Sequence, residues 1–370
     1  NLINLGFWPG GDRDGNPFVS VDTTLQVASR LRDVLLQCYY QDLRNLRRRI
    51  SFSGVYEDLM AIEKMVLRCI RHQDEWDFKM FRSSLHKVLN DLHEHHDSIF
   101  VELVEELLDR VALFGSHFAS IDLRQDSREI KRAFDALAEQ LKLDVPTTPE
   151  ELFALDAHWD GTLIGDDRVD DTLQSFRVIR EIQAKNGPKG AHRYIISNCR
   201  GAMDVARVFA LARWTAFGDE KISVDIVPLF ETIDDLVGAG ASMNTLYSES
   251  NYRRHLTQRG NKQTIMLGFS DGTKDGGYMS ANWNIYRAKE NLTRISKLND
   301  IDVVFFDGRG GPPARGGGNT HNFYASLGQQ IASSEIQLTV QGQTISSNFG
   351  TSESAQFNME QLITAGLENL

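Results

Sequence analysis

Charged residues follow apolar stretches at several points in the second half of the chain, and these residue types can bind and activate an anion. The positions are Arg124, Glu231, Asp271, Lys274, Asp307, Arg309 and Arg315. In parallel α/β folds the carboxyl ends of the strands carry the active site, so these side chains are expected on one face. The alternative for any single residue is a helix cap or a solvated loop residue. Agreement among four loops favours a site.

The segment from Gly308 to Gly318 has the most unusual composition, GRGGPPARGGG. Its glycines let backbone N–H groups approach an anion closely, and its two arginines add guanidinium groups. It lacks the Gly-Lys-Ser/Thr ending of a P-loop, and Pro313 stands where a dinucleotide fingerprint needs its third Gly. A flexible linker would contain Ser and polar residues instead of paired Arg and Pro. The segment therefore predicts binding of an anionic ligand.

Glu231 and Asp271 follow consecutive expected strands and are suited to hold one Mg²⁺ or Mn²⁺ that keeps positions open for substrate oxygens. The alternative is that each carboxylate pairs with a neighbouring Arg or Lys. The polar loops at 270–277 and 12–17 do not match calcium loops, because neither has a Glu at the twelfth position. Both are interpreted as ion-pair or ligand loops.

Two further candidates are weaker. His93, His96 and Asp97 share a helix face and could bind zinc, but no further ligand is evident and a solvated helix end is favoured. Cys199 precedes Arg200, which could lower the pKa of the thiol, although a buried structural thiol is the default.

The order of apolar runs defines the elements that must position these residues. Strands are expected at 120–123, 194–197, 224–230, 264–269 and 302–306, with a sixth candidate at 336–340. Helical patterns lie between them, at 204–217, at 279–298 and from Pro149 onward. Near-continuous apolar strands that alternate with helices predict a parallel sheet covered on both faces. The number of units favours an incomplete (β/α)8 barrel over an open sheet.

The first third is expected to be helical, so the domains are predicted as a helical region over 1–115 and a partial α/β barrel over 116–370. Thr23 and Gln26 form a capping-box pattern at the start of the first helix. Amphipathic patterns follow at 55–72, 76–96 and 97–114. The chain starts without Met and stops inside a helical pattern that begins at Glu353, so it is expected to be an internal piece of a longer protein.

Composition excludes several classes of protein. The 370 residues carry a formal net charge of −11, and 41% are hydrophobic and 25% charged, as in ordinary globular proteins. No run approaches the ~20 apolar residues of a membrane helix. The acidic balance argues against nucleic acid as a partner. Cys38, Cys69 and Cys199 give no disulfide framework, which favours the cytoplasm.

Five motifs resemble phosphoenolpyruvate carboxylase, in that family's order. They are GGDRDGNP at 10–17, FGSHFASIDLRQDSR at 114–128, LFETIDDL at 229–236, MLGFSDGTKDGG at 266–277 and FDGRGGPPARGGGNTH at 306–321. The resemblance covers nearly the whole chain, and the last three motifs are highly specific.

The resemblance implies a PEP/pyruvate barrel that forms oxaloacetate and phosphate from phosphoenolpyruvate and bicarbonate, through carboxyphosphate and a metal-stabilised enolate. It implies catalytic roles for Arg124, Lys274, Asp307 and Arg309, and substrate binding by Arg124, Arg309, Gly310 and Gly311. Glu231 and Asp271 would hold Mg²⁺ or Mn²⁺, and Arg315 would bind an aspartate or malate effector. The full-length parent would be a homotetramer with no nucleic-acid or membrane partner.

Two departures from the family pattern bear on activity. The family usually has His before Gly-Arg-Gly-Gly, where this chain has Asp307, and a family motif with a catalytic His, upstream of GGDRDGNP, is absent from the chain. The isolated chain is therefore expected to be inactive. Two other functions stay open: a non-carboxylating Mg-dependent barrel protein that binds an enol phosphate, and an anion-binding regulatory protein.

Overall fold

The computed structural model describes residues 3–16, 18–72, 75–269, 276–309, 318–332 and 334–367. Of the expected site residues, Asp271, Lys274, Gly310, Gly311 and Arg315 lie outside these ranges. The backbone groups into two compact units. One comprises residues 1–123 and 177–192, and the other comprises 124–176 and 193–370. The domain boundary expected at 115/116 stays a prediction.

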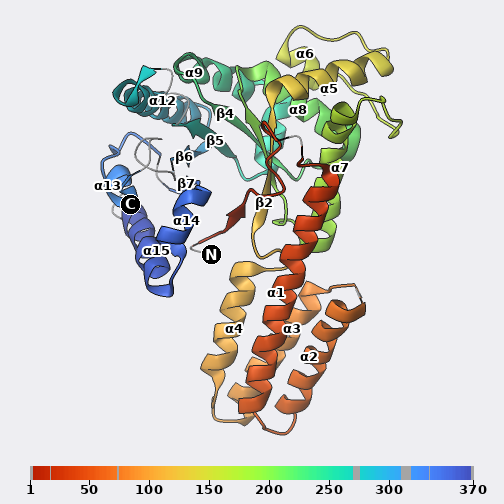
Figure 1. The fold of residues 1–370 in the computed structure, drawn as a ribbon, viewed down its shortest axis with the longest axis vertical. Coiled ribbons are helices and arrows are strands. Elements are labelled where there is room, and N and C mark those ends of the chain that lie inside the picture. Colours follow the sequence, from red (N-terminus) through yellow and green to blue (C-terminus); the bar gives the residue numbers. More distant parts are fainter. Residues whose placement is uncertain are drawn as a thin grey trace. The chain divides into compact units, whose positions relative to one another are not determined.

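The first unit contains a bundle of four helices. They are α1 (Val21–Arg49), α2 (Val55–His72), α3 (Phe78–His95) and α4 (Val101–Phe114). Helix α1 contacts α2 and α4, and α3 contacts the same two helices (Figure 1). Leu35, Tyr39, Leu43 and Leu46 recur on one face of α1 and are buried in the shared core. The bundle thus forms because each helix has a single apolar face to cover.

Within the described residues, seven strands form a parallel sheet in which neighbours follow the order of the sequence. The strands are β1 (Gly6–Phe7), β2 (Ser120–Asp126), β3 (Arg193–Ser197), β4 (Asp225–Phe230), β5 (Lys262–Gly268), β6 (Asp302–Gly308) and β7 (Ile336–Leu338). The register pairs Leu229 with Met266, and Asp307 with Leu267 and Leu338. The sheet is an incomplete α/β barrel, which confirms the expected fold class. The six expected strands are present, and among the described residues the short β1 is the one strand that was not anticipated.

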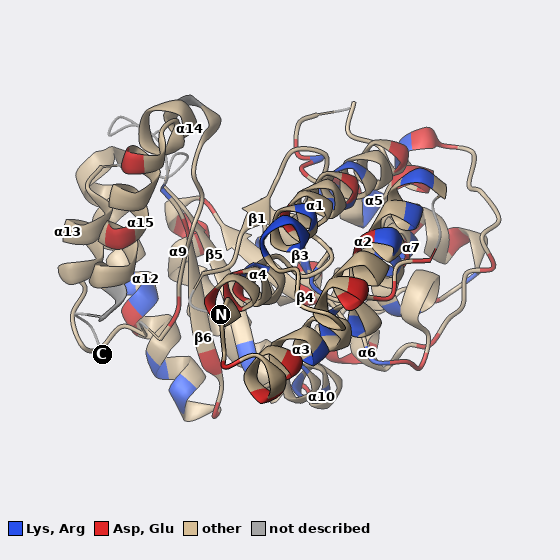
Figure 2. Cartoon of the chain, turned by 90° about the horizontal axis from the view of Figure 1, so that it is seen from below, with Lys and Arg blue, Asp and Glu red and all other residues tan. Residues whose placement is uncertain are grey.

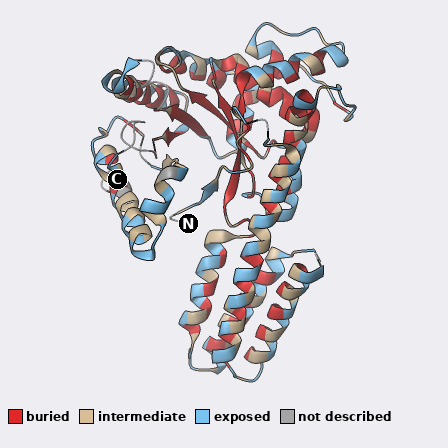
Figure 3. Ribbon diagram, in the orientation of Figure 1, coloured by how far each residue is buried: buried red, intermediate tan, exposed pale blue. Residues whose placement is uncertain are grey.

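Helices cover the sheet in the second unit. The helices described after the bundle are α5 (Ser127–Gln140), α6 (Pro149–Ala154), α7 (Asp167–Asn186), α8 (Ala202–Ala212), the π-helix η1 (Arg213–Phe217), α9 (Ile233–Ser248), α10 (Ser250–Gln258), α12 (Tyr278–Leu298), α13 (Thr320–Ala325), α14 (Gly342–Phe349) and α15 (Ser352–Leu367). Helices α8 and α9 contact β4, α10 contacts β5 and α12 contacts β6. Strands β3 to β6 are buried along most of their length (Figure 3), as expected for a sheet with helices packed against it.

Surface charge is mixed. Figure 2 shows acidic and basic residues interspersed along the helices. None of the described helices is both long and apolar enough to span a bilayer.

Candidate active site

The carboxyl ends of β2, β3 and β4 meet around one carboxylate. Glu231 directly follows β4, and its Oε1 lies 3.7 Å from Nη2 of Arg124, near the end of β2. Its Oε2 accepts a hydrogen bond of 2.7 Å from the backbone N–H of Asn198, directly after β3. Both charged side chains are largely buried, at 17% and 16% exposure. The structure therefore brings together two of the residues that the sequence singled out.

Asn198, directly after β3, forms hydrogen bonds with residues that directly follow β4 and β2. It has a left-handed backbone with φ of 51°, a conformation that Asn adopts more readily than most residues. The Ser127 hydroxyl donates to its carbonyl oxygen at 2.7 Å. Burial raises the pKa of the neighbouring Asp126, but hydrogen bonds from Arg128 outweigh burial and hold that pKa below its usual value. The rim of the site is therefore fixed by hydrogen bonds.

The last residue of β5 leaves room for Glu231. A Cβ on Gly268 would lie 3.1 Å from Cγ of Glu231 and 3.2 Å from its Cα. A larger residue at this position would push the carboxylate away from the strand ends. The glycine in the sequence Leu267-Gly268-Phe269 thus has a positional role at the site.

Arg309 directly follows β6 and lies against two aromatic rings. Its Cζ lies 3.8 Å from the ring centroid of Phe323 on α13 and 5.9 Å from that of Phe269, after β5. The residue is only 6% exposed. Burial lowers the pKa of its guanidinium, but the group stays protonated because the pKa of arginine is ordinarily very high. Stacking of this kind fixes the plane of the fork-shaped cation and suits it to phosphate or carboxylate oxygens.

Asp307 points towards the helices behind β6. Both of its Oδ atoms lie 2.8 Å from Nζ of Lys289 on α12, and the Tyr324 hydroxyl of α13 donates to Oδ2 at 2.8 Å. Asp307 is fully buried. Its charge is thus compensated inside the protein.

The surroundings of the two weaker candidates, Cys199 and the histidine cluster, show what each residue contacts. Burial raises the pKa of the Cys199 thiol, which makes Cys199 a structural residue and not a reactive one. His93 Nδ1 lies 2.9 Å from the Ser98 hydroxyl, and His96 stacks on Phe52. No group of three metal-ligating side chains occurs within the part of the chain that the structure describes.

Glu231 is a described residue whose chemistry suits a divalent cation, although one of its oxygens already faces Arg124 and the other accepts the Asn198 N–H. A carboxylate at the strand ends is the hard oxygen donor that Mg²⁺ and Mn²⁺ prefer, and Mg²⁺ sites often use one or two carboxylates together with substrate oxygens. The donor type therefore fits. The second expected ligand, Asp271, lies outside the described residues.

Sequence reasoning missed several residues around the site. They are Asn198, Lys289, Phe323 and Tyr324. Lys289 left a signal, because it falls on the apolar stripe of α12 with Ile285 and Leu292, where a lone cation needs a buried partner. The other three depend on contacts between elements and left no comparable pattern.

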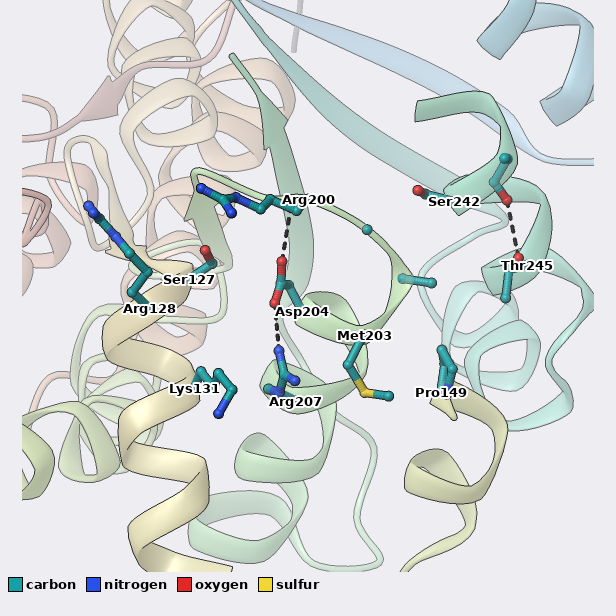
Figure 4. Close-up of a pocket in the computed structure, with 13 residues that line it drawn as sticks. Ser127, Arg128, Lys131, Pro149, Arg200, Met203, Asp204, Arg207, Ser242 and Thr245 are labelled. Atoms are coloured by element: carbon teal, nitrogen blue, oxygen red, sulfur yellow. Dashed lines mark hydrogen bonds and ion pairs between the residues drawn. The ribbon is translucent and has the colours of Figure 1, made fainter. Parts of the chain in front are cut away.

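A cavity of about 700 Å³ lies among α5, α8 and α9 and reaches Ser127, whose hydroxyl donates to Asn198 at the rim of the site (Figure 4). Its basic lining residues are Arg128, Lys131, Arg200 and Arg207. Asp204 lies between two of them, since it pairs with Arg207 at 2.7 Å and accepts the backbone N–H of Arg200 at 3.0 Å. Arg128 and Lys131 are also paired with carboxylates. None of the residues expected to be functional lines this cavity.

Comparison with known proteins identifies the family. A family model described as phosphoenolpyruvate carboxylase matches residues 1–75 and 61–370. The phosphoenolpyruvate carboxylase of Nitrosomonas europaea is 30% identical over 427 aligned residues, which cover 100% of this chain and 46% of that protein. That of Gloeobacter violaceus is 28% identical and is covered to the same 46%. The chain thus spans about half the length of these curated relatives.

The family match extends over all the strands whose ends carry Arg124, Glu231 and Arg309. The resemblance seen in the five sequence motifs is therefore confirmed. On these grounds the chain belongs to the phosphoenolpyruvate carboxylase family.

Proposed function

We propose that the protein containing this chain forms oxaloacetate and phosphate from phosphoenolpyruvate and bicarbonate. One observation carries the proposal: in a chain of this family, Arg309 is buried and stacked at the end of β6. The Arg124–Glu231 pair lies at the ends of β2 and β4. Two anionic substrates require such a local cationic site in a chain whose net charge is −11.

The reaction balances in three steps. A bicarbonate oxygen attacks phosphorus and the bond from phosphorus to the enol oxygen breaks, which gives carboxyphosphate and the enolate of pyruvate. Carboxyphosphate then releases CO₂ and leaves phosphate. Finally the enolate carbon attacks CO₂ and forms the new C–C bond of oxaloacetate.

The residues of this chain bind and orient the reactants. Arg309, Gly310, Gly311 and Arg124 are proposed to bind substrate. Arg124, Lys274 and Arg309 would neutralise negative charge on the phosphoryl and carboxylate oxygens during transfer. Because Arg309 is already packed against the ring of Phe323, little conformational freedom is lost when it binds an anion.

Glu231 and Asp271 are proposed to hold Mg²⁺ or Mn²⁺. When bound, this ion supplies positive charge that stabilises the oxygen of the enolate. Arg315 is proposed to bind an aspartate or malate effector. The full-length protein is proposed to be a cytoplasmic homotetramer that feeds oxaloacetate into central carbon metabolism.

The test compares two stacked arginines in the full-length protein. Arg309 lies after a strand and its Cζ is 3.8 Å from the ring of Phe323. Arg193 begins β3 and its Cζ is 5.5 Å from the ring of Phe306, so the control is matched in residue type and also has an aromatic neighbour, at a longer distance. We expect oxaloacetate formation, coupled to malate dehydrogenase, in the wild type and a loss of about 10²-fold or more in kcat/KM for Arg309→Lys. Arg193→Lys should stay within threefold of wild type.

Wild-type protein that binds phosphoenolpyruvate without forming oxaloacetate would contradict the proposal and favour the non-carboxylating alternatives. Equal losses in the two arginine variants would contradict the role of Arg309.

A further inference from the structure

A buried charge cluster lies behind Arg309. Lys289 of α12 and Asp307 of β6 each have 1% side-chain exposure, and Nζ lies 2.8 Å from both carboxylate oxygens. The Tyr324 hydroxyl of α13 adds a third contact at 2.8 Å. Three elements that are separate in the sequence therefore meet at one carboxylate. We refer to Lys289, Asp307 and Tyr324 as the triad.

The surroundings of the triad are aromatic. The rings of Phe305, Phe323 and Tyr324 have their centroids 5.2, 5.2 and 5.8 Å from Nζ of Lys289. In such a site either charge would be costly alone, and removal of one partner from a buried pair leaves the other uncompensated. Lys289 and Asp307 are thus mutually dependent.

The triad connects to Arg309 through α13. Phe323 and Tyr324 are consecutive residues of this short helix. The Tyr324 hydroxyl donates a hydrogen bond to Asp307, while the ring of Phe323 lies 3.8 Å from Cζ of Arg309. Arg309 also follows Asp307 by two residues on the same strand end. Any movement of Tyr324 would therefore displace the ring that supports the guanidinium.

Charge balance gives a second connection. Lys289 Nζ and Arg309 Cζ both lie near the Phe323 ring, so two cations share one aromatic group. Asp307 lies between these two residues in the sequence, and the negative charge of its carboxylate offsets the repulsion between the two cations. Without it, both cations would be less favourable in this position.

We infer that Lys289, Asp307 and Tyr324 are positioning residues that hold Phe323 and Arg309 in the geometry for anion binding. In this inference, which rests on the proposed function, Asp307 acts through its partners and transfers no proton to substrate. Lys289 is the residue that lets this chain carry a buried Asp before Gly-Arg-Gly-Gly.

The experiment is a set of variants in the full-length protein: Asp307→Asn, Lys289→Met, Tyr324→Phe, and the double variant Lys289→Met/Asp307→Asn. We expect each change to a charged partner to lower kcat/KM for phosphoenolpyruvate by about 10- to 100-fold. The double variant should recover at least threefold over Asp307→Asn, because it leaves no unpaired buried charge. A proton-transfer role for Asp307 predicts no such recovery, and its absence would overturn the inference.

A second cycle separates positioning from general stability. Tyr324→Phe should weaken binding of inorganic phosphate in the wild-type background and have no effect in the Arg309→Lys background. Glu63→Gln, which breaks the 2.6 Å ion pair with Arg47 in the helical bundle, serves as control. It should change thermal stability without changing phosphate affinity. Additive effects of Tyr324→Phe and Arg309→Lys would overturn the inference.

The phosphate measurement also distinguishes the two proposals. Absence of oxaloacetate in the wild type would contradict the proposed function, whereas unchanged phosphate affinity in folded Asp307→Asn protein would contradict only the positioning role.

Discussion

His255 on α10 is buried at 4% exposure among aromatic rings, with Phe209 and Tyr252 each 5.8 Å away between centroids. Burial lowers its pKa from 6.5 to about 4, and the cations Arg259 and Lys221 act in the same direction, against Asp225. As pH falls, His255 therefore takes up a proton in the unfolded chain at a higher pH than in the folded protein. The contribution of neutral His255 to the free energy of unfolding is fully present above pH 6.5 and is lost between pH 6.5 and 4.

We therefore predict that His255→Phe reduces the acid sensitivity of the fold. Between pH 7 and pH 5 the wild type should lose about 2 kcal/mol more unfolding free energy than the variant, from the difference between the two pKa values. Urea unfolding at several pH values measures this. His117, whose pKa is also about 4, is present in both proteins and cancels. A profile of unfolding free energy against pH for His255→Phe that runs parallel to the wild-type profile would contradict the prediction.

At the residue scale, sequence alone could place Arg124, Glu231 and Arg309 at strand ends, because strand periodicity is local and a polar residue that ends an apolar run is visible in it. It could not show the buried pair of Lys289 with Asp307, since that contact joins a helix and a strand whose relative rotation is set by packing. The roles expected for residues outside the described ranges stay predictions.

At the scale of elements, the segment 8–11 packs closely on β2. Trp8 Nε1 donates to Asp122 at 3.0 Å, and the N–H of Gly11 donates to the carbonyl of Trp8 at 2.9 Å. A Cβ on Gly11 would lie 2.1 Å from the carbonyl oxygen of Asp122 and 2.8 Å from Cγ2 of Ile121. Backbone cannot yield as a flexible side chain does, so the segment would have to move off the strand.

Gly11→Ala is therefore predicted to destabilise the protein by about 1–3 kcal/mol, as expected for overpacking. Gly238→Ala is the matched control, because a Cβ there meets nothing within 4 Å and the residue lies inside helix α9. That variant should be more stable by up to about 1 kcal/mol. Thermal unfolding followed by circular dichroism measures both. A midpoint for Gly11→Ala equal to that of wild type would show that the close approach is not required.

Element boundaries follow local chemistry where it is unambiguous. Thr148 caps α6 ahead of Pro149, and α2 spans the expected 55–72. The start of α1 was predicted incorrectly, because Ser20 and not Thr23 is its N-cap, and the Ser20 side chain accepts the N–H of Thr23. Two hydroxyl residues three positions apart both fit the cap pattern, and the backbone settles the choice. The two-residue β1 is too short to show periodicity.

At the scale of the whole molecule, the chain corresponds to about 46% of its curated relatives, and its described strands do not close into a barrel. We predict that the chain by itself produces no oxaloacetate with metal and both substrates present. An incomplete rim lacks groups that position reactants, and each such loss typically costs ~10²–10⁴ in rate. Affinity for phosphoenolpyruvate should remain, since Arg309 and its aromatic support lie within the chain.

The measurement is oxaloacetate production by the purified chain beside the full-length protein, together with calorimetric titration of phosphoenolpyruvate. Turnover within tenfold of the full-length protein would show that the residues of this chain suffice for catalysis.

The strands from β3 to β7 lie side by side in the order in which they occur along the sequence. The neighbour of each of these strands in the sheet is the strand that precedes it in the sequence. During synthesis each new strand can therefore pair with one that has already left the ribosome. Arg124 and Glu231 would come together once β4 has emerged, while Arg309 arrives only with β6 and is supported only after α13. The nascent chain thus assembles the carboxylate side of the site before its buried arginine, and a pause between β4 and β6 would leave the arginine side of the site still to be built.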